Sequence, residues 1–312
     1  MLRCGKFDLA VCDKTVPFDA RLLLSGGIMP MPSRPYRSVL YIPGSKQRAL
    51  EKALTLHADA IIFDLEDAVA PDEKESARNI LAAALHDGYG NRARIVRING
   101  FDTEWGRADA VAFARHPCVD AILIPKVSSA ADLDAVAAMV PDKPLWAMME
   151  TARAMLNAAE IAAHPRLEGM VMGTNDLARE LGCRPRADRL PLQAGLAMCL
   201  LAARAEGRVI VDGVYNAFKD EAGLRAECDQ GRDMGFDGKT LIHPAQLEIA
   251  NAAFAPTQAD VDLARRQIEA FDAALLAGQA VAVVDGRIVE NLHVVTAKAT
   301  LARMDAIAAM AE

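Results

Sequence analysis

The chain has 312 residues, of which 52 % are hydrophobic and 5 % aromatic, so a substantial aliphatic core in one large or two ordinary domains is expected. Its net charge of -7 argues against broad binding to nucleic acids or anionic membranes, but not against a local basic pocket for a phosphorylated ligand. There is no apolar run of about 18 residues, so neither a transmembrane helix nor a secretory signal is expected. Six scattered cysteines without a C-x-x-C spacing indicate free thiols in the cytoplasm.

Residues 1–36 show no hydrophobic period, and we interpret them as an N-terminal extension that need not be ordered. From Arg37 onward, short apolar runs alternate with Ala-rich amphipathic stretches that are typical of helices. Runs without polar alternation indicate strands buried on both faces, as in a parallel sheet. Eight such runs occur, at 38–44, 59–67, 93–100, 120–127, 144–150, 169–176, 208–214 and 238–244.

Eight strand–helix units predict an α/β fold of the (β/α)8 TIM-barrel type over residues 37–256. An open doubly wound sheet is the alternative, but it would usually carry a Gly-rich phosphate-binding fingerprint after its first strand, and none is present.

The remaining residues, 257–312, predict a C-terminal helix–hairpin–helix extension. A long helix is expected over 257–278, and a hairpin turns at Asp285-Gly286 between β-branched runs. A final helix begins near Leu292. This lid region lies outside the eight units, so it is expected to cap the barrel or to reach a neighbouring subunit.

In such barrels the chemistry lies at the carboxyl ends of the strands. Glu150 and Asp176 end consecutive predicted strands, which lie about 4.8 Å apart in a sheet. Two carboxylates so close repel unless a cation or a proton lies between them, and oxygen ligands favour Mg²⁺ or Mn²⁺. The alternative is that both residues only cap the helices that follow them.

Other strand ends also carry charged residues. Arg97 ends the third run and is well shaped to hold a carboxylate bidentately, unless it is a structural partner of Glu66 or Asp67. Lys126, after the fourth run, is more typical of an ion pair than of a Schiff base. His243, after the eighth, is a candidate base, cap or substrate contact.

An ordered set of motifs resembles the HpcH/HpaI aldolase and citrate lyase family, in its branch of citrate lyase beta subunits, malyl-CoA lyases and citramalyl-CoA lyases. The similar stretches run from Arg37 to the C terminus: RSVLYIPG, DLEDAVAPDEKESAR, VRIN, LIPKV, METARAMLNAAEIA, MGTNDLARELG, GFDGKTLIHPAQL and AVVDGRIVEN. Each motif is weak alone, but the ordered set is specific. The resemblance implies a TIM barrel that binds Mg²⁺ and breaks or forms a carbon–carbon bond in an acyl-CoA ester.

Carried onto matching positions, the resemblance implies that Glu150 and Asp176 bind Mg²⁺ and that Arg97 holds the carboxylate of the keto acid. It also implies substrate contacts, near the first strand and at the end of the eighth, for Tyr41, Arg48, Lys52, Ile242 and His243.

One departure concerns the C-terminal acid/base residue, which is usually an Asp, often contributed across a subunit boundary. Here Glu290 stands at that place, and Asn291-Leu292 replace the proline that often follows. An added methylene moves the carboxylate by about 1 Å, and such shifts can cost about a hundredfold in rate. The substrate or the acid/base step is therefore expected to differ from that of citryl-CoA or malyl-CoA lyases.

The function expected first is a Mg²⁺-dependent lyase that cleaves a 3-hydroxyacyl-CoA ester by retro-Claisen chemistry to a 2-oxo acid and an acyl-CoA. Glu290 is the candidate acid/base, with Glu66 or Asp67 in reserve. The alternatives are a CoA-independent 2-oxo-acid aldolase, a malyl-CoA thioesterase-like enzyme, and a citrate lyase beta subunit that needs an acyl-carrier protein. A homo-oligomer is expected, with a trimer favoured by the resemblance.

Overall fold

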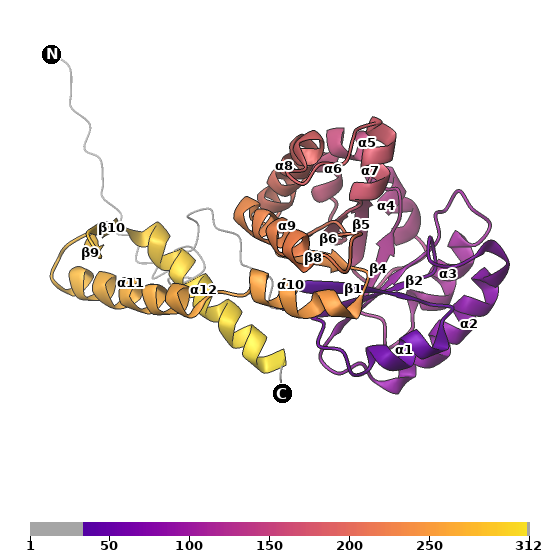
Figure 1. Ribbon diagram of the computed structural model, residues 1–312, viewed down its shortest axis with the longest axis horizontal. Coiled ribbons are helices and arrows are strands. Elements are labelled where there is room, and N and C mark those ends of the chain that lie inside the picture. Colours follow the sequence, from indigo (N-terminus) through magenta and orange to yellow (C-terminus); the bar gives the residue numbers. More distant parts are fainter. Residues whose placement is uncertain (1–33, 311–312) are drawn as a thin grey trace, which may run out of the picture. The chain divides into compact units, whose positions relative to one another are not determined.

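The computed structural model describes residues 34–310, so most of the predicted N-terminal extension lies outside the described residues. Its centre is a closed barrel of eight parallel strands in sequence order (Figure 1). This confirms the predicted TIM barrel and rules out the open sheet. The strands are β1 Ser38–Pro43, β2 Ala60–Asp64, β3 Ala93–Arg97, β4 Ala121–Ile124, β5 Leu145–Met149, β6 Leu167–Met172, β7 Val209–Asp212 and β8 Gly238–Leu241.

Helices follow each strand and surround the barrel (Figure 1). They are α1 Gln47–Ala53, α2 Lys74–Ala84, α3 Gly106–Ala114, α4 Ala130–Ala137, α5 Ala152–Leu156, α6 Ala158–Ala162, α7 Thr174–Leu181, α8 Leu190–Ala205, α9 Glu221–Met234 and α10 Leu247–Phe254. Short 3-10 turns lie at Pro71–Glu73, Leu85–Asp87 and Pro244–Gln246. No helix among residues 34–310 is long and apolar enough to cross a membrane.

Side chains alternate between the barrel interior and the surrounding helices, because successive residues of a strand point to opposite faces. The interior is filled by small and branched residues such as Ala60, Ile62 and Val171, whereas Ile61 and Phe63 pack against the helices. The same alternation turns Asp64 inward at the end of β2. Its partner in the parallel register on β3 is Arg97.

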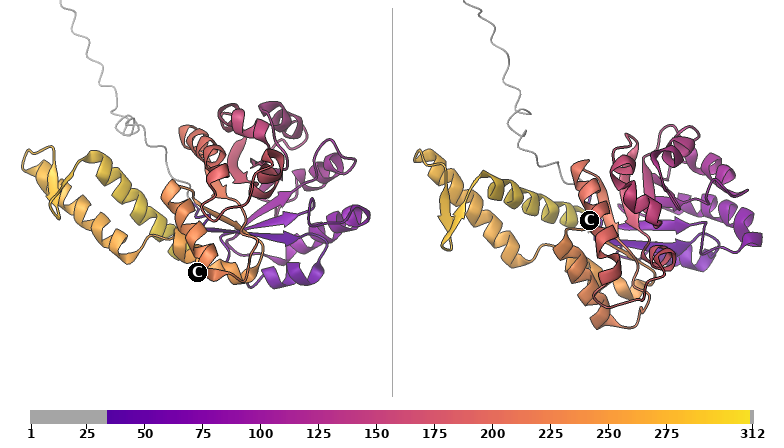
Figure 2. Two further views of the ribbon diagram at one scale, coloured as in Figure 1. Left: turned by 45° about the horizontal axis from the view of Figure 1, so that its top comes forward. Right: turned by 90° about the horizontal axis from the view of Figure 1, so that it is seen from above.

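The C-terminal residues form the predicted helix–hairpin–helix, in which α11 (Gln258–Leu276) and α12 (Asn291–Met310) pack side by side (Figure 2). Between them β9 (Ala282–Val284) and β10 (Arg287–Val289) pair antiparallel around Asp285-Gly286. Both turn residues have positive φ, which matches the twist of a two-residue hairpin. Phe271, Val289 and Val294 belong to a small apolar cluster of this extension that is separate from the barrel core.

Candidate functional site

A pocket of about 290 Å³ lies at the carboxyl ends of the strands. Three of the charged residues predicted from the sequence line it together, namely Arg97, Glu150 and Asp176. Tyr41, Asp67 and Ile242 line it as well, so the chain brings six of the predicted site residues to one cavity. Asp64, Met148, Met172 and Thr174 complete much of its wall.

Arg97 is buried and held at the base of this pocket by Asp64. Its Nε and Nη2 donate to the two carboxylate oxygens of Asp64 at 2.7 and 2.6 Å. Nη1 forms an ion pair with Glu66 at 3.0 Å and a longer one with Asp67 at 3.6 Å, and the guanidinium lies 5.0 Å from the ring centroid of Tyr41. The main partner of Arg97 is therefore Asp64, which the sequence interpretation did not name.

The guanidinium of Arg97 stays charged and keeps donors free. Burial alone would lower its pKa, but Asp64, Tyr41 and Glu66 raise it above the ordinary value. Arginine has five N–H donors, and Asp64 accepts two of them in one-to-one hydrogen bonds, while Nη1 forms an ion pair with Glu66. The remaining N–H groups on Nη1 and Nη2 leave room for a further carboxylate.

Glu66 is buried between two cations. Its Oε2 pairs with Arg97, and its Oε1 accepts a hydrogen bond from the Lys126 ammonium at 2.6 Å. Burial raises the pKa of Glu66 in spite of these partners, and the bond to Glu66 raises the pKa of Lys126 although burial opposes it. Lys126 is thus a protonated ion-pair partner, as predicted, and not the neutral amine that a Schiff base requires.

Glu150 follows β5 with only 2 % of its surface exposed. Its Oε1 accepts a hydrogen bond from the backbone N–H of Lys126 at 2.7 Å, and within residues 34–310 this is the one hydrogen bond that its carboxylate receives. On the other side lies Gly173. A Cβ built there would lie 2.6 Å from Oε2 of Glu150, so only glycine leaves space for this carboxylate.

Burial raises the pKa of Glu150 to about 7, and the neighbouring carboxylates of Asp176 and Glu66 add to this effect. The Lys126 N–H and Arg97 act in the opposite direction. A buried carboxyl group with such a pKa costs free energy when it is ionised without a counter-charge. It is therefore a group that a proton or a cation would stabilise.

Asp176 lies in the first turn of α7, and its carboxylate is partly exposed and paired with Arg179. Within residues 34–310, no group of three or more His, Cys, Asp and Glu side chains is arranged to hold a metal ion. A pair of carboxylates nevertheless suits Mg²⁺, which keeps several waters and usually takes one or two protein carboxylates together with substrate oxygens. The donors of Glu150 and Asp176 fit this ion in chemistry and in charge.

The alternative that Glu150 only caps the next helix does not match the local geometry. The cap of α5 is Thr151, whose side chain accepts the N–H of Ala154 at 3.0 Å. The carboxylate of Glu150 instead contacts the turn after β4.

Four predicted site residues, namely His243, Arg48, Lys52 and Glu290, lie elsewhere. His243 caps the turn Pro244–Gln246 by accepting the Ala245 N–H through Nδ1 at 3.2 Å, and its ring stacks on Phe218 at 4.5 Å. Arg48 and Lys52 are exposed on α1 and do not line the pocket of Glu150.

Glu290 stands between β10 and α12, with its backbone N–H donated to Nδ1 of His293 at 3.0 Å. Among the residues that the structure describes in this one chain, Glu290 is not part of the pocket lining. The fold of a single chain therefore does not bring this carboxylate to Arg97 and Glu150.

A second group of buried charges lies outside the barrel wall. Asp212 ends β7 but points toward α8 and α9, where it pairs with Arg189 at 2.7 Å and with Lys239 at 3.1 Å. Lys239 also contacts Glu227 at 2.6 Å. We call Arg189, Asp212, Glu227 and Lys239 the outer cluster, and Asp64, Glu66, Arg97, Lys126 and Glu150 the inner cluster.

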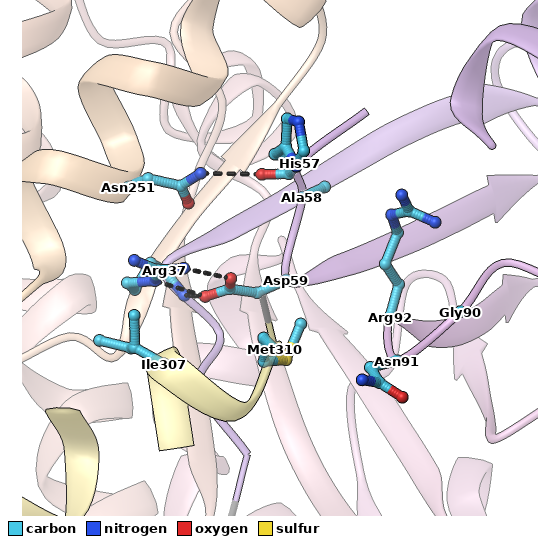
Figure 3. A pocket seen from close by; sticks show the side chains of 10 residues that line it. All are labelled: Arg37, His57, Ala58, Asp59, Gly90, Asn91, Arg92, Asn251, Ile307 and Met310. Carbon is cyan, nitrogen blue, oxygen red and sulfur yellow. Dashed lines mark hydrogen bonds and ion pairs between the residues drawn. The ribbon is translucent and has the colours of Figure 1, made fainter. Parts of the chain in front are cut away.

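Another pocket, of about 550 Å³, contains none of the predicted site residues (Figure 3). It lies near the beginnings of the strands, where Arg37 pairs with Asp59 at 2.8 Å, and Ile307 and Met310 of α12 contribute to its wall. The candidate site is therefore the smaller pocket at the opposite ends of the strands.

Barrels of this architecture carry their chemistry at the carboxyl ends of the strands, so fold and pocket place the chain among the (β/α)8-barrel enzymes. Residues 37–244 match the model of the HpcH/HpaI aldolase/citrate lyase family, and the chain belongs to this family.

Its relatives include enzymes of more than one reaction type. The chain is 74 % identical to a (3S)-malyl-CoA thioesterase of Cereibacter sphaeroides strain ATCC 17023, over 89 % of this chain and 97 % of that protein. It is 35 % identical to an L-malyl-CoA/beta-methylmalyl-CoA lyase of C. sphaeroides strain ATCC 17029, over 89 % and 97 %. The structure of CitE from Mycobacterium tuberculosis in complex with magnesium, acetoacetate and coenzyme A is similar with a TM-score of 0.73 and 30 % identity, covering 88 % of this chain and all of that one.

These relatives support an enzyme of the family and Mg²⁺ as the family's metal. Among the functions expected from the sequence, they favour the thioesterase alternative over the carbon–carbon lyase that was expected first.

Proposed function

We propose that this protein is a Mg²⁺-assisted hydrolase of a short 3-hydroxyacyl-CoA thioester that carries a free carboxylate, of which (3S)-malyl-CoA is the type. The observation that carries the proposal is the 74 % identity to a (3S)-malyl-CoA thioesterase over nearly its full length. The pocket supports it, because one anchored arginine and two further carboxylates suit a substrate with a carboxylate and an adjacent hydroxyl.

Arg97 would bind the substrate carboxylate with its free Nη1 and Nη2 donors, while Asp64 holds Nε and the other Nη2 donor. Tyr41 packs against the guanidinium, with its ring centroid 5.0 Å away. Substrate binding would then require little rearrangement of the arginine, which lowers the entropic cost of orientation. Ile242 would contact the acyl chain at the mouth, where its side chain is exposed.

Glu150 and Asp176 would hold the Mg²⁺. When bound there, the ion supplies positive charge that polarises substrate oxygens and offsets the buried carboxylates. In the protein itself, the Lys126 N–H and Gly173 confine the carboxylate of Glu150, so that Oε2 is the oxygen left for a ligand. The raised pKa of Glu150 is consistent with a site that lacks a counter-charge until a cation arrives.

Hydrolysis adds water to the thioester. A general base takes one proton from the water, its oxygen attacks the thioester carbonyl, the carbon–sulfur bond breaks, and the CoA thiolate takes a proton as it leaves. The products are the free dicarboxylic acid and CoA. Both oxygens of Glu66 are occupied by Arg97 and Lys126, which leaves Asp67, 61 % exposed at the mouth, as the candidate base within the chain.

Glu290 remains the candidate base from a neighbouring subunit, since the single chain does not bring it to the pocket. We propose that C-terminal extensions are exchanged in a homo-oligomer, for which a trimer is favoured, and that Arg48 and Lys52 contact the CoA moiety. The expected location is the cytoplasm, where CoA thioesters occur.

The test is product analysis with (3S)-malyl-CoA. Hydrolysis releases a free thiol and malate, whereas retro-Claisen cleavage releases glyoxylate and acetyl-CoA, so a thiol assay and a carbonyl assay on the same sample separate the two reactions. We expect thiol release that requires Mg²⁺ and is abolished in Glu150→Ala and in Asp176→Ala. Full activity in both variants, or glyoxylate in place of thiol, would contradict the proposal.

The contribution of Glu290 is tested by complementation. Glu150→Gln and Glu290→Gln should each be inactive alone, but co-expressed chains should regain part of the activity, because mixed oligomers contain sites with an intact Glu150 from one chain and an intact Glu290 from another. A mixture as inactive as its parents would contradict the exchange of C-terminal extensions between subunits. Full activity of Glu290→Gln alone would assign the base to Asp67, and Asp67→Asn would then abolish hydrolysis.

The carbon–carbon lyase remains the second candidate, because the 35 % identical relative is a malyl-CoA lyase. A CoA-independent aldolase would act on the 2-oxo acid without CoA, and a subunit of the citrate lyase type would need an acyl-carrier protein. Activity on free (3S)-malyl-CoA by the isolated chain would exclude both of these alternatives.

A further inference from the structure

Lys126 has an uncommon backbone conformation at the edge of the pocket. It follows β4 with a φ of +51°, in the left-handed region. Long side chains rarely adopt this region, because Cβ approaches the following carbonyl oxygen. Such conformations persist only where the surrounding structure holds them, and they concentrate at functional sites.

This conformation lets one residue contact two carboxylates with different functions. The backbone N–H of Lys126 donates to Oε1 of Glu150 at 2.7 Å, while its ammonium donates to Oε1 of Glu66 at 2.6 Å. The other oxygen of Glu66 pairs with Nη1 of Arg97 at 3.0 Å. Glu66 is therefore shared between Lys126 and Arg97.

The sharing matters because Glu66 competes with any substrate carboxylate for Arg97. With Lys126 in place, Glu66 gives only one oxygen to the guanidinium. Without the ammonium, both oxygens of Glu66 could turn to the free Nη1 and Nη2 donors, in the bidentate arrangement that arginine and carboxylates favour. Those are the donors that a substrate would need.

We propose that Lys126 is a positioning residue that keeps Glu66 from blocking Arg97, and so maintains the affinity of the pocket for the substrate carboxylate. This inference rests on the proposed function, since it takes Arg97 as the group that binds this carboxylate. It concerns the affinity for the carboxylate and not the chemical step.

The test is a double-mutant cycle with Lys126→Met and Glu66→Gln. Lys126→Met keeps the backbone N–H and most of the side-chain length but removes the ammonium. The KM for (3S)-malyl-CoA should rise about tenfold, the loss of roughly one charge-assisted hydrogen bond, with kcat within about twofold of wild type. In the Glu66→Gln background, the same Lys126→Met change should leave KM unchanged within about twofold, because the competing charge is gone.

Two further measurements separate this inference from the proposed function. The dissociation constant of malate in the presence of Mg²⁺, measured by titration calorimetry, should rise about tenfold in Lys126→Met, as KM does. The dissociation constant of Mg²⁺ alone should not rise. Arg265→Met is the charge-matched control, since it removes one cation from an exposed pair with Asp262 on α11 and should change none of these values.

The outcomes are distinct. An unchanged KM and malate affinity with a lower melting temperature would show that the Lys126–Glu66 pair is only structural, and would overturn the inference. An equal rise of KM in both backgrounds would mean that Lys126 contacts the substrate itself, and would overturn it too. A wild-type protein that binds malate but does not hydrolyse malyl-CoA would refute the proposed function, while the malate affinities would still decide the inference.

Discussion

The inner and outer clusters lie on opposite sides of the same barrel wall and differ in their charge balance. In the outer cluster, two carboxylates face two cations, and Asp212 is bound through both oxygens. Burial alone would raise the pKa of Asp212, but Lys239 and Arg189 lower it. In the inner cluster, Asp64 and Glu66 pair with the two cations, the third carboxylate, of Glu150, forms no ion pair, and the pKa of Glu150 is raised to about 7.

The difference in charge balance indicates which buried charges stabilise the fold and which form a binding site for a ligand. A cluster whose carboxylates and cations balance and pair with one another stabilises the positions of its own elements, here β7, β8, α8 and α9. A cluster with excess negative charge beside a cavity is incomplete without a cation or a proton. Both clusters are buried, so burial by itself does not separate the two cases.

The largest expected effect comes from the outer cluster. Lys239→Met leaves two carboxylates with Arg189 alone and should lower the free energy of unfolding by about 3–5 kcal/mol, the usual cost of breaking a buried ion pair. Urea denaturation measures this loss, while the Mg²⁺ affinity of the folded protein should not change. The matched variant is Lys126→Met in the inner cluster, where the side chain is 49 % exposed and the expected cost is below about 1 kcal/mol. Equal losses in the two variants would remove the distinction between the clusters.

The next effect concerns pH in metal-free protein. Glu150 has a folded pKa of about 7, whereas an unfolded Glu has about 4.3, so the folded protein loses stability as the pH rises between these values. Glu150→Gln should therefore be more stable than wild type by up to about 4 kcal/mol above pH 7, with no difference near pH 4. Urea denaturation in EDTA at several pH values measures the difference.

Asp212→Asn is the control, and its effect on the free energy of unfolding should have the opposite sign. The pKa of Asp212 is lowered, so its contribution is present above the unfolded value of about 3.9 and is lost as the pH falls below it. This variant should be less stable than wild type at neutral pH, and the gap should narrow only in acid. If the free energy of unfolding of Glu150→Gln changed with pH in the same way as that of wild type, the raised pKa of Glu150 would be contradicted.

A smaller effect is expected from Arg97→Lys, which keeps the charge but loses the bidentate contact with Asp64 and the planar fork. The KM for (3S)-malyl-CoA should rise roughly 10- to 100-fold, because one or two charge-assisted hydrogen bonds are lost. The Mg²⁺ affinity, measured by calorimetry without substrate, should change little. A loss of Mg²⁺ affinity with an unchanged KM would mean that Arg97 serves the metal site and not the substrate.

The smallest effect tests the helix cap beside Glu150. Thr151→Ala removes the acceptor for the Ala154 N–H and should cost about 1 kcal/mol of stability without altering Mg²⁺ affinity. If Glu150 were the cap, Glu150→Gln would show this loss and Thr151→Ala would not.

The fold was largely predictable from the chain. All eight apolar runs are strands, in order, and the C-terminal helix, hairpin and helix form where their patterns predict them. The predicted runs extended past the strand ends, as at 120–127 against Ala121–Ile124, because Pro125 and Val127 in the loop that follows are also buried. Polar residues at the strand ends pointed to Arg97, Glu150 and Asp176, and these do share one pocket.

The sequence left the partners and the directions of these side chains open. Asp64 and Asp212 both end apolar runs, yet one faces the pocket and the other faces the helices. His243 caps a turn, and Glu290 lies outside the pocket of its own chain. No pattern along the chain predicted that Lys126 would bridge Glu66 and Glu150.

The amino-acid pattern alone predicts a (β/α)8 barrel with acids and an arginine at the carboxyl ends of its strands. Hydrophobic runs and turn residues carry that information locally. Which charges meet depends on the folded barrel, because the side chains of a strand change face at every residue and uniformly apolar runs do not mark the inner face. Charge balance is a property of neighbours in space. The folded barrel was therefore needed to show that Arg97 binds Asp64, that Lys126 lies between two glutamates, and that Asp212 points outward.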